Sequence, residues 1–212
     1  MRFIMNEKIN EIPLIRQSVF TTPLKDIDNT KIVHDINAYG KPVGYVGAGY
    51  GAVSRGFVQY EDIVMPVTPE ITKLEMSVIG VLKQLTNRDY KISEMWAVKL
   101  ENNQSIIAHS HDSNSHQYPE EYYSASYYPS APDGSASLTF SSNWCGRMSG
   151  LTEIKVETGL LIVFNSFLTH MTGRQKINLP RMVVSFNLSP IEPNTNPNAD
   201  WSCYWSRPVV DY

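Results

Sequence analysis

The hydrophobic pattern of the chain changes near residue 87. Before that point the clearest element is TPEITKLEMSVIGVLKQLTN, where apolar residues recur at helical spacing: Ile71, Leu74, Val78, Leu82 and Leu85. This spacing places one apolar stripe on the helix and predicts that the stripe packs against a core. Thr68 is the expected N-cap and Pro69 the first helical residue, because each is favoured at that position.

Shorter elements precede this helix. SVFTTPLK, residues 18–25, favours a strand that closes at Pro23, and DIDNTKIVHDINAYG favours a helix capped by Asp28 or Asn29 and ended by Gly40. The glycines of GYVGAGYGAVSRG, residues 44–56, do not have the GxGxxG spacing, and no apolar strand leads into them. We therefore interpret this segment as a flexible loop and not as a dinucleotide-binding turn.

After residue 87 the chain consists of short β-favouring runs separated by Asn, Gly, Pro and Ser. These runs are ISEMWAVKL, SIIAHSH, YYSASYYP, ASLTFSS, TEIKVETG, LLIVFNS and RMVVSFNL. Strands at this spacing, after an N-terminal helical part, predict an α+β protein whose C-terminal half is a β-sandwich or jelly roll. We expect one domain over residues 1–190. Residues 191–212 form an Asn/Pro-linked aromatic tail that is expected to dock on its own domain or on a neighbour.

Composition narrows the class of protein. The 212 residues are 42% hydrophobic and 18% charged, which is typical of a globular chain. The net charge of −3 gives no general attraction to nucleic acid. The two cysteines, Cys145 and Cys203, form no CxxC pair, which excludes a disulfide framework and a zinc ribbon. Because no apolar stretch approaches membrane-spanning length, we expect a soluble, cytoplasmic protein without membrane contact.

Histidines are concentrated in AHSHDSNSH, residues 108–116. If SIIAHSH is a strand, His109 and His111 face the same side and can hold one metal ion. Asp112 then points to the opposite face, unless the strand ends there. Two histidines with a third ligand from elsewhere make a facial site that leaves positions open. On its own the motif is also typical of a polar loop.

The segment GLLIVFNSFLTHMTGRQKINLPRMVVSFNLSP, residues 159–190, adds a third histidine. A strand over Leu160–Phe164 runs into a turn that delivers His170, and a second apolar strand starts at Arg181. A buried arginine is costly unless it meets an anion, and a dicarboxylic acid can pair with it in a bidentate fork. Alternatively, His170 is a turn residue and Arg181 a surface residue beside a core strand.

These segments together resemble a known family. SVFTTPLKDID, EMWAVKLENNQSIIAHSH, SASYYPSAPDGSASLTF, GLLIVFNSFLTH and RMVVSFN follow the order of motifs in the 2-oxoglutarate/Fe(II) oxygenases common in bacteriophage genomes. This family is a branch of the double-stranded β-helix (jelly-roll) superfamily. The similarity covers about residues 18 to 190, and Trp96 stands at the family's tryptophan position.

The resemblance implies a fold, an activity and residue roles. The fold would be a double-stranded β-helix with flanking N-terminal helices. The metal ligands of Fe(II) would be His109, His111 and His170; Arg181 would bind the distal carboxylate of 2-oxoglutarate, and Tyr127 or Tyr128 would line the same site. The activity would be hydroxylation of a substrate coupled to conversion of 2-oxoglutarate to succinate and carbon dioxide.

Departures from the family pattern keep alternatives open. The superfamily prefers His-x-Asp where this chain has His-x-His, so Asp112 is an alternative ligand to His111. Other departures are Val183, Asn165 and Ala125. A second hypothesis is a catalytically degenerate jelly roll that serves as a phage virion component, with homo-oligomer or virion contacts through the tail. A third is a zinc hydrolase whose general base is Asp112, Glu120 or Glu121.

Overall fold

The computed structural model describes residues 10–14, 17–42, 61–111, 122–144 and 147–191. The N-terminal elements are β1 (Asn10–Leu14), β2 (Gln17–Pro23), α1 (Asn29–Tyr39), β3 (Lys41–Pro42), β4 (Glu61–Val64) and α2 (Pro69–Thr86). The strands that follow are β5 (Tyr90–Leu100), β6 (Ile106–His109), β7 (Tyr123–Ser130), β8 (Leu138–Trp144), β9 (Arg147–Ile154), β10 (Leu160–Asn165), β11 (His170–Thr172) and β12 (Arg181–Pro190).

Both helices begin at the caps that the sequence predicts. Asp28 accepts the backbone N–H of Lys31 at the start of α1, and Thr68 accepts the N–H of Ile71 at the start of α2. Each cap satisfies a backbone donor that the first helical turn leaves free. The helix ends follow from local chemistry too, because Asn87 adopts the left-handed conformation after α2, with φ of 57°.

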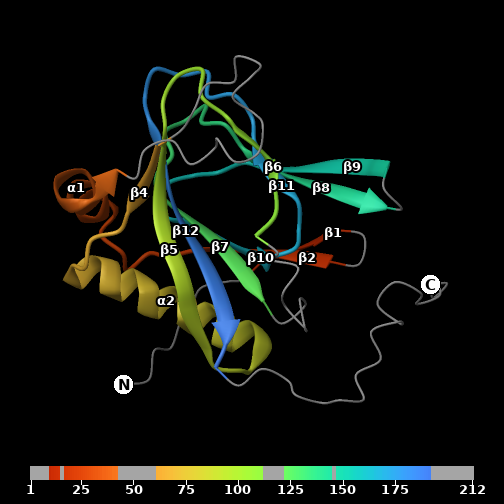
Figure 1. The fold of residues 1–212 in the computed structure, drawn as a ribbon, viewed down its shortest axis with the longest axis horizontal. Coiled ribbons are helices and arrows are strands. Elements are labelled where there is room, and N and C mark those ends of the chain that lie inside the picture. The colour runs from red at the N-terminus through yellow and green to blue at the C-terminus, as the bar shows by residue number, and fades with distance from the viewer. Residues whose placement is uncertain (1–9, 15–16, 43–60, 112–121, 145–146, 192–212) are drawn as a thin grey trace.

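The strands form two antiparallel sheets with jelly-roll connectivity. The larger sheet has the order β1-β2-β10-β7-β12-β5-β4-β3, and the smaller has the order β6-β11-β8-β9. Strands β5 to β12 alternate between the sheets, except at the β8–β9 hairpin, so β5, β7, β10 and β12 share one sheet and β6, β8, β9 and β11 the other. The expected α+β jelly roll is confirmed, and Figure 1 shows the two sheets facing each other.

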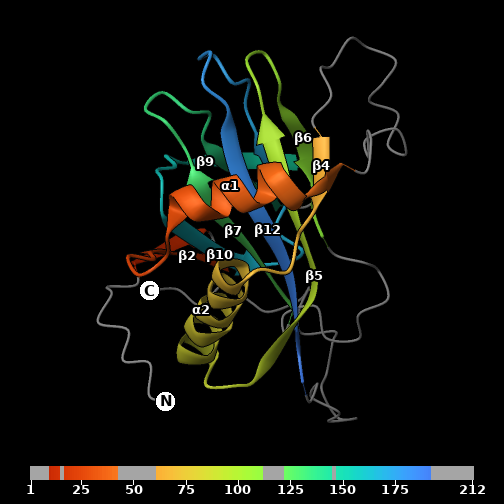
Figure 2. The ribbon, with the colours of Figure 1, turned by 90° about the vertical axis from the view of Figure 1, so that its left-hand side faces the viewer.

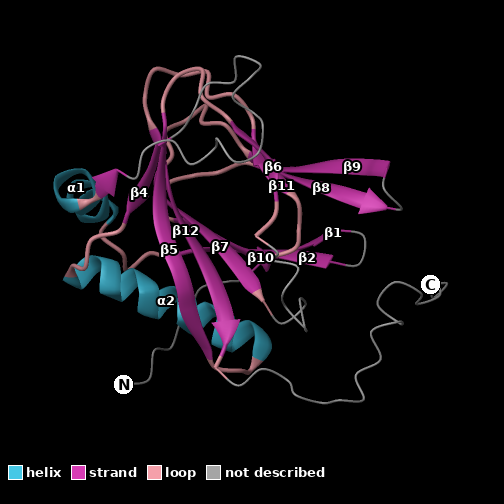
Figure 3. Ribbon diagram, viewed as in Figure 1, coloured by secondary structure: helices cyan, strands magenta, loops and turns pink. Residues whose placement is uncertain are grey.

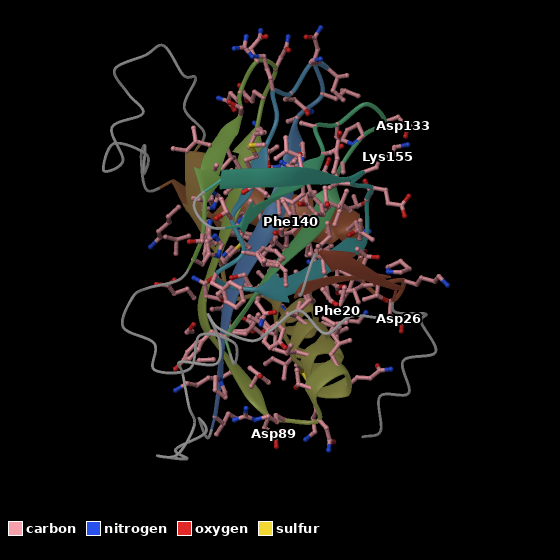
Figure 4. All side chains as sticks on the ribbon, turned by 90° about the vertical axis from the view of Figure 1, so that its right-hand side faces the viewer. Phe20, Asp26, Asp89, Asp133, Phe140 and Lys155 are labelled. Atoms are coloured by element: carbon pink, nitrogen blue, oxygen red, sulfur yellow. The ribbon has the colours of Figure 1, made fainter. Side chains whose placement is uncertain are left out.

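The larger sheet is covered on both faces. One face packs against the two helices through residues such as Ile36, Leu74 and Phe186, and both helices lie on that side in Figures 2 and 3. The other face packs against the smaller sheet. Phe140 belongs to this second core and lies near the centre of the molecule in Figure 4. The surfaces of the two sheets that face each other are therefore the inner face of the jelly roll, and the candidate site lies on it.

The N-terminal part differs from the sequence prediction in three strands. The strand expected at residues 18–25 is present as β2 and ends at Pro23, but β1, β3 and β4 were not expected, and they extend the two edges of the larger sheet. Such edge strands are held by backbone hydrogen bonds, which leave little trace in a local hydrophobic pattern. The glycine-rich segment 44–56 and almost all of the tail lie outside the described residues. No helix in the described ranges is both long and apolar enough to cross a membrane.

Candidate metal centre

Three histidines meet at one end of the inner face. His109 ends β6, His170 begins β11, and the two are paired in register. His111 follows two residues after His109, and its backbone N–H donates to Ser166 O at 2.9 Å. One ring nitrogen of each histidine lies within 4.8 Å of the others, so the three side chains can hold one metal ion. The structure therefore brings together the three predicted ligands.

The predicted strand ends earlier than the sequence suggested. SIIAHSH was expected to be a strand through His111, but β6 ends at His109. His111 thus reaches the site from the segment after the strand, and its backbone bond to Ser166 anchors that segment to the turn between β10 and β11. Asp112, Glu120 and Glu121 lie outside the described residues, so the alternatives that rest on them stay predictions.

Hydrogen bonds fix which nitrogen of each ring can bind a metal. Nδ1 of His109 lies 2.8 Å from the carbonyl oxygen of Ile107, and Nδ1 of His170 lies 2.8 Å from that of Leu168. Because a carbonyl only accepts, both Nδ1 atoms carry the proton, and both Nε2 atoms keep a free lone pair. A metal-binding histidine has this tautomer when its other nitrogen donates to a carbonyl or carboxylate.

His111 is oriented by side chains. Its Nδ1 lies 2.8 Å from Asn187 Oδ1 and 3.0 Å from Ser124 Oγ. Ser124 is fully buried, and its hydroxyl is also within hydrogen-bond distance of Ser166 Oγ and Asn187 Oδ1. Glu94 Oε2 accepts a hydrogen bond from Asn187 Nδ2 at 2.6 Å. A network of side-chain hydrogen bonds thus orients His111, whereas backbone carbonyls orient the rings of His109 and His170.

Burial keeps the three imidazoles neutral. Desolvation, followed by the proximity of His109, lowers the pKa of His111 to about 4. Desolvation is also the main cause that lowers the pKa of His109 and holds the pKa of His170 well below its usual value. At neutral pH each ring therefore has a lone pair available without first losing a proton.

Aromatic rings surround the site. Phe164 and Phe140 lie 4.8 and 5.9 Å from His170, measured between ring centroids. Trp96 lies 5.4 Å from His111 by the same measure. These rings fix the orientation of the imidazoles and exclude water from one side of them, which strengthens any charge interaction there.

Arg181 lies on the same inner face with an incomplete set of partners. Its side chain is 1% exposed, and Nη1 is 3.4 Å from Thr172 Oγ1. Thr172 follows His170 by two residues on β11, so both side chains point to the same side of that strand. The guanidinium carbon lies 4.8 Å from the centre of the Tyr128 ring. In the described part of the chain, Arg181 Nε has no hydrogen-bond partner, and the Tyr128 hydroxyl, which lies near Arg181 and Ser126, makes no hydrogen bond of regular geometry.

A buried guanidinium in this state is unusual. No acidic side chain of the described residues forms an ion pair with Arg181. An uncompensated buried charge costs several kcal/mol, roughly, so such a group is normally matched by an anion. Two adjacent groups without a regular hydrogen-bond partner among the described residues, Arg181 Nε and the Tyr128 hydroxyl, are what a bound carboxylate would satisfy.

The structure does not bring Tyr127 to this group. Tyr127 packs in the core between the larger sheet and the helices, and its hydroxyl donates to Asn29 Oδ1 at 2.5 Å. Successive residues of a strand face opposite sides of the sheet, so it is Tyr128 that contacts Arg181. Of the two tyrosines expected to line a co-substrate site with Arg181, only Tyr128 therefore lies beside it.

Sequence reasoning also missed Asn187, Glu94, Ser124 and Thr172. Asn187 and Thr172 could have been found, because each lies an even number of residues from a predicted site residue on the same strand and therefore faces the same side. Asn187 shares its face with Arg181, and Thr172 shares its face with His170. No local signal existed for Glu94 or Ser124, because each is linked to Asn187 only by the register between strands.

Comparison with known proteins identifies the fold. No family model matches the chain. No curated protein has a significantly similar sequence. HygX from Streptomyces hygroscopicus, solved with nickel and 2-oxoglutarate bound, has a TM-score of 0.60 and 14% identity, over 82% of this chain and 83% of that one. The epimerase SnoN, in complex with Fe3+, alpha ketoglutarate and nogalamycin RO, has a TM-score of 0.62 and 12% identity, over 82% and 79%. The chain therefore has the double-stranded β-helix fold that these structures share.

Proposed function

We propose that this protein is an Fe(II)- and 2-oxoglutarate-dependent oxygenase that hydroxylates a substrate still to be identified. The observation that carries the proposal is the pairing of two features on one inner face. Three neutral histidines converge there, and a buried arginine that has no acidic partner among the described residues lies beside the third histidine's strand. The likeness of the fold to HygX and SnoN, which were solved with a metal and this co-substrate, supports the metal and the co-substrate of the proposal.

The ligand set fits a divalent iron ion. Imidazole nitrogen is a good ligand for iron, and a facial arrangement of three protein ligands leaves positions open for other molecules. Here all three ligands are neutral, whereas a two-histidine, one-carboxylate site carries a negative charge. The metal would therefore keep its full positive charge, which favours an anionic co-substrate beside it.

Arg181 and its neighbours fit a dicarboxylic co-substrate. A distal carboxylate at Arg181 would accept hydrogen bonds from Arg181 Nε and from the Tyr128 hydroxyl, two of the buried groups that have no regular hydrogen-bond partner among the described residues. Burial raises the pKa of Tyr128, which keeps its hydroxyl protonated and able to donate. Thr172 contacts Arg181 and lies two residues after His170 on β11, so it would line the site between the two ends of the bound co-substrate.

Each residue then has a defined task. Bound Fe(II) and 2-oxoglutarate supply the oxidising chemistry for hydroxylation. His109, His111 and His170 hold the metal through Nε2, and the carbonyl and amide acceptors behind them keep the rings from turning. Arg181 fixes one end of the co-substrate, and Phe164 and Phe140 exclude water from the side of His170.

The alternatives have less support among the described residues. A degenerate virion scaffold predicts that Arg181 is neutralised inside the protein, and the described residues provide no such partner. The bacteriophage origin, the location in an infected cell or virion, and contacts through the tail rest on the motif resemblance and stay predictions. A zinc hydrolase needs a general base, and its candidates lie outside the described residues.

Metal binding is the first test. Protein loaded anaerobically with Fe(II) should bind about one equivalent, and His109→Ala combined with His170→Ala should abolish that binding. A double variant that binds iron as well as the wild type would show that the histidine trio is not the site.

Arg181 provides the second test. Arg181→Lys should weaken 2-oxoglutarate binding to the iron-loaded protein about tenfold or more, because an ammonium does not reproduce the guanidinium fork. Arg174→Lys is the matched control, since Arg174 is exposed on the loop before β12. The wild type should also convert 2-oxoglutarate slowly to succinate without an added substrate. If 2-oxoglutarate neither binds nor turns over in iron-loaded wild type, the oxygenase proposal is wrong.

A further inference from the structure

Glu94 lies outside the ring of candidate ligands but is connected to it. It is exposed on β5, and its Oε2 accepts a hydrogen bond from Asn187 Nδ2 at 2.6 Å. Asn187 Oδ1 in turn lies 2.8 Å from His111 Nδ1. Two hydrogen bonds therefore join a surface carboxylate to one of the three metal-binding rings.

The chemistry of these groups sets the direction of both bonds. A carboxylate can only accept, so the amide of Asn187 must turn its NH₂ toward Glu94. The amide oxygen then faces His111 and can only accept, so His111 must carry its proton on Nδ1. Its Nε2 is left with a free lone pair, which is the form that binds a metal.

Strand pairing in the larger sheet places Asn187 beside two of its side-chain partners. Asn187 is paired directly with Glu94 on one side and with Ser124 on the other. The register of β12 against β5 shifts between Asn187 and Leu188, because Leu188 pairs with Ile92 and leaves Ser93 as an extra residue. Such a β-bulge re-aims side chains and is common beside functional sites. Asn187 and Glu94 are the last pair of the regular ladder that begins at Arg181 and Leu100, and the bulge at Ser93 lies directly beside them.

The other two histidines have no comparable arrangement. His109 and His170 donate to the carbonyls of Ile107 and Leu168, which lie two residues earlier in the same chain segment and can only accept. A backbone carbonyl cannot be exchanged for a donor. A side-chain amide can be, because rotation by half a turn replaces its oxygen by its nitrogen. His111 is therefore the one ligand of the three whose tautomer depends on a distant side chain.

We propose that Glu94 is a positioning residue: it fixes the amide of Asn187, which holds His111 in the metal-binding tautomer. The proposal rests on the proposed function, because it assumes that the histidine trio holds a metal. It adds a surface residue that controls the site without touching the metal. It also places the negative charge of Glu94 two hydrogen bonds away from a metal site whose three ligands are neutral.

Glu94→Lys is the decisive variant. A lysine ammonium can only donate, so Asn187 should turn its oxygen toward it and present its NH₂ to His111. His111 should then accept at Nδ1 and carry its proton on Nε2, where it blocks the metal. Long-range ¹H–¹⁵N correlation spectra of the histidine rings, recorded on metal-free protein, read this tautomer directly. We expect the Nδ1–H form in wild type and the Nε2–H form in the variant.

Metal affinity provides the second measurement. Anaerobic titration with Co²⁺ alone should show a 10- to 100-fold rise in Kd for Glu94→Lys, roughly the loss known for outer-shell partners. Glu94→Gln can still accept from Asn187 and should stay close to wild type. Glu101→Lys makes the same change of charge just beyond the other end of β5 and should also leave the tautomer and the Kd nearly unchanged.

A compensating variant separates orientation from charge. When Glu94→Lys is combined with Asn187→Asp, the new carboxylate accepts from both the lysine and His111, so the Nδ1–H form and the Co²⁺ affinity should return. The proposed relay, by which Glu94 acts through Asn187 on His111, is refuted if His111 has the Nε2–H form in wild type. It is also refuted if Glu94→Lys changes neither the tautomer of His111 nor the Kd for Co²⁺. If wild type binds no Co²⁺ while the tautomers respond as expected, the relay stands and the metal site of the proposed function is wrong.

Discussion

Acidification of the metal-free protein tests whether the histidine trio is buried as the structure indicates. In the unfolded chain a histidine has a pKa of about 6.5. In the folded protein the pKa of His111 is lowered to about 4, mainly by desolvation. Above pH 6.5 the ring is neutral in both states, and it contributes nothing to the pH dependence of stability.

The contribution appears as the pH falls. Between pH 6.5 and about 4 the unfolded chain binds a proton at His111 and the folded protein does not, so the free energy of unfolding decreases. The decrease is about 1.4 kcal/mol per pH unit, or about 3 kcal/mol over two units. Total stabilities are on the order of 5–15 kcal/mol, so this loss is large. The pKa values of His109 and His170 are also lowered, and they act in the same direction.

Urea unfolding with a chelator present, at several pH values from 7 to 4.5, measures this loss. Carboxylates also titrate there, so the informative quantity is the difference between wild type and His111→Gln, which lacks the proton-binding group. The stability of this variant should fall less steeply, by about 1.4 kcal/mol per pH unit. His34→Gln is the control, because the His34 side chain is 65% exposed. Equal slopes for wild type and His111→Gln would mean that His111 is not buried as a neutral ring.

Three further outcomes are expected. Chelation should leave a single cooperative thermal transition, because both cores form without metal; a loss of cooperativity would instead mark the metal as structural. Gln175→Ala should lower the free energy of unfolding by about 2–4 kcal/mol in urea, since Gln175 is fully buried and pairs with Ala136 N and Leu179 O; exposed Lys176→Ala should change it by less than about 0.5 kcal/mol. Asn87→Gly should be neutral or stabilising and Asn87→Ala destabilising by about 1 kcal/mol in the same assay, because residue 87 has a φ of 57°; equal effects of the two would contradict this reason.

Much of the fold was readable from the sequence because it depends on local chemistry. The caps at Asp28 and Thr68 are short-range hydrogen bonds within the chain that forms each helix. The strand leading to the turn before His170, and the strand that starts at Arg181, were evident from apolar runs bounded by turn residues. The family resemblance then supplied the roles that are proposed for the three histidines and the arginine.

The faces of the strands were harder to predict. The interior of β7, from Ser124 to Pro129, is buried throughout, because helices cover one face of the larger sheet and the smaller sheet covers the other. Such a strand has no alternation of polar and apolar residues to show which side is which. The choice between Tyr127 and Tyr128 was therefore decided only by the tertiary structure.

The residues that orient the candidate ligands could not be predicted from the sequence, for a related reason. Glu94, Ser124 and Asn187 are far apart in the chain, and they meet because three strands pair in one register, with a bulge at Ser93. Register is set by the packing of whole sheets, and a shift of one residue would turn each side chain to the other face. The sequence by itself determined which groups are candidates for the chemistry, while the tertiary structure decided which neighbours orient them, since long-range pairing leaves no periodic signal along a single strand.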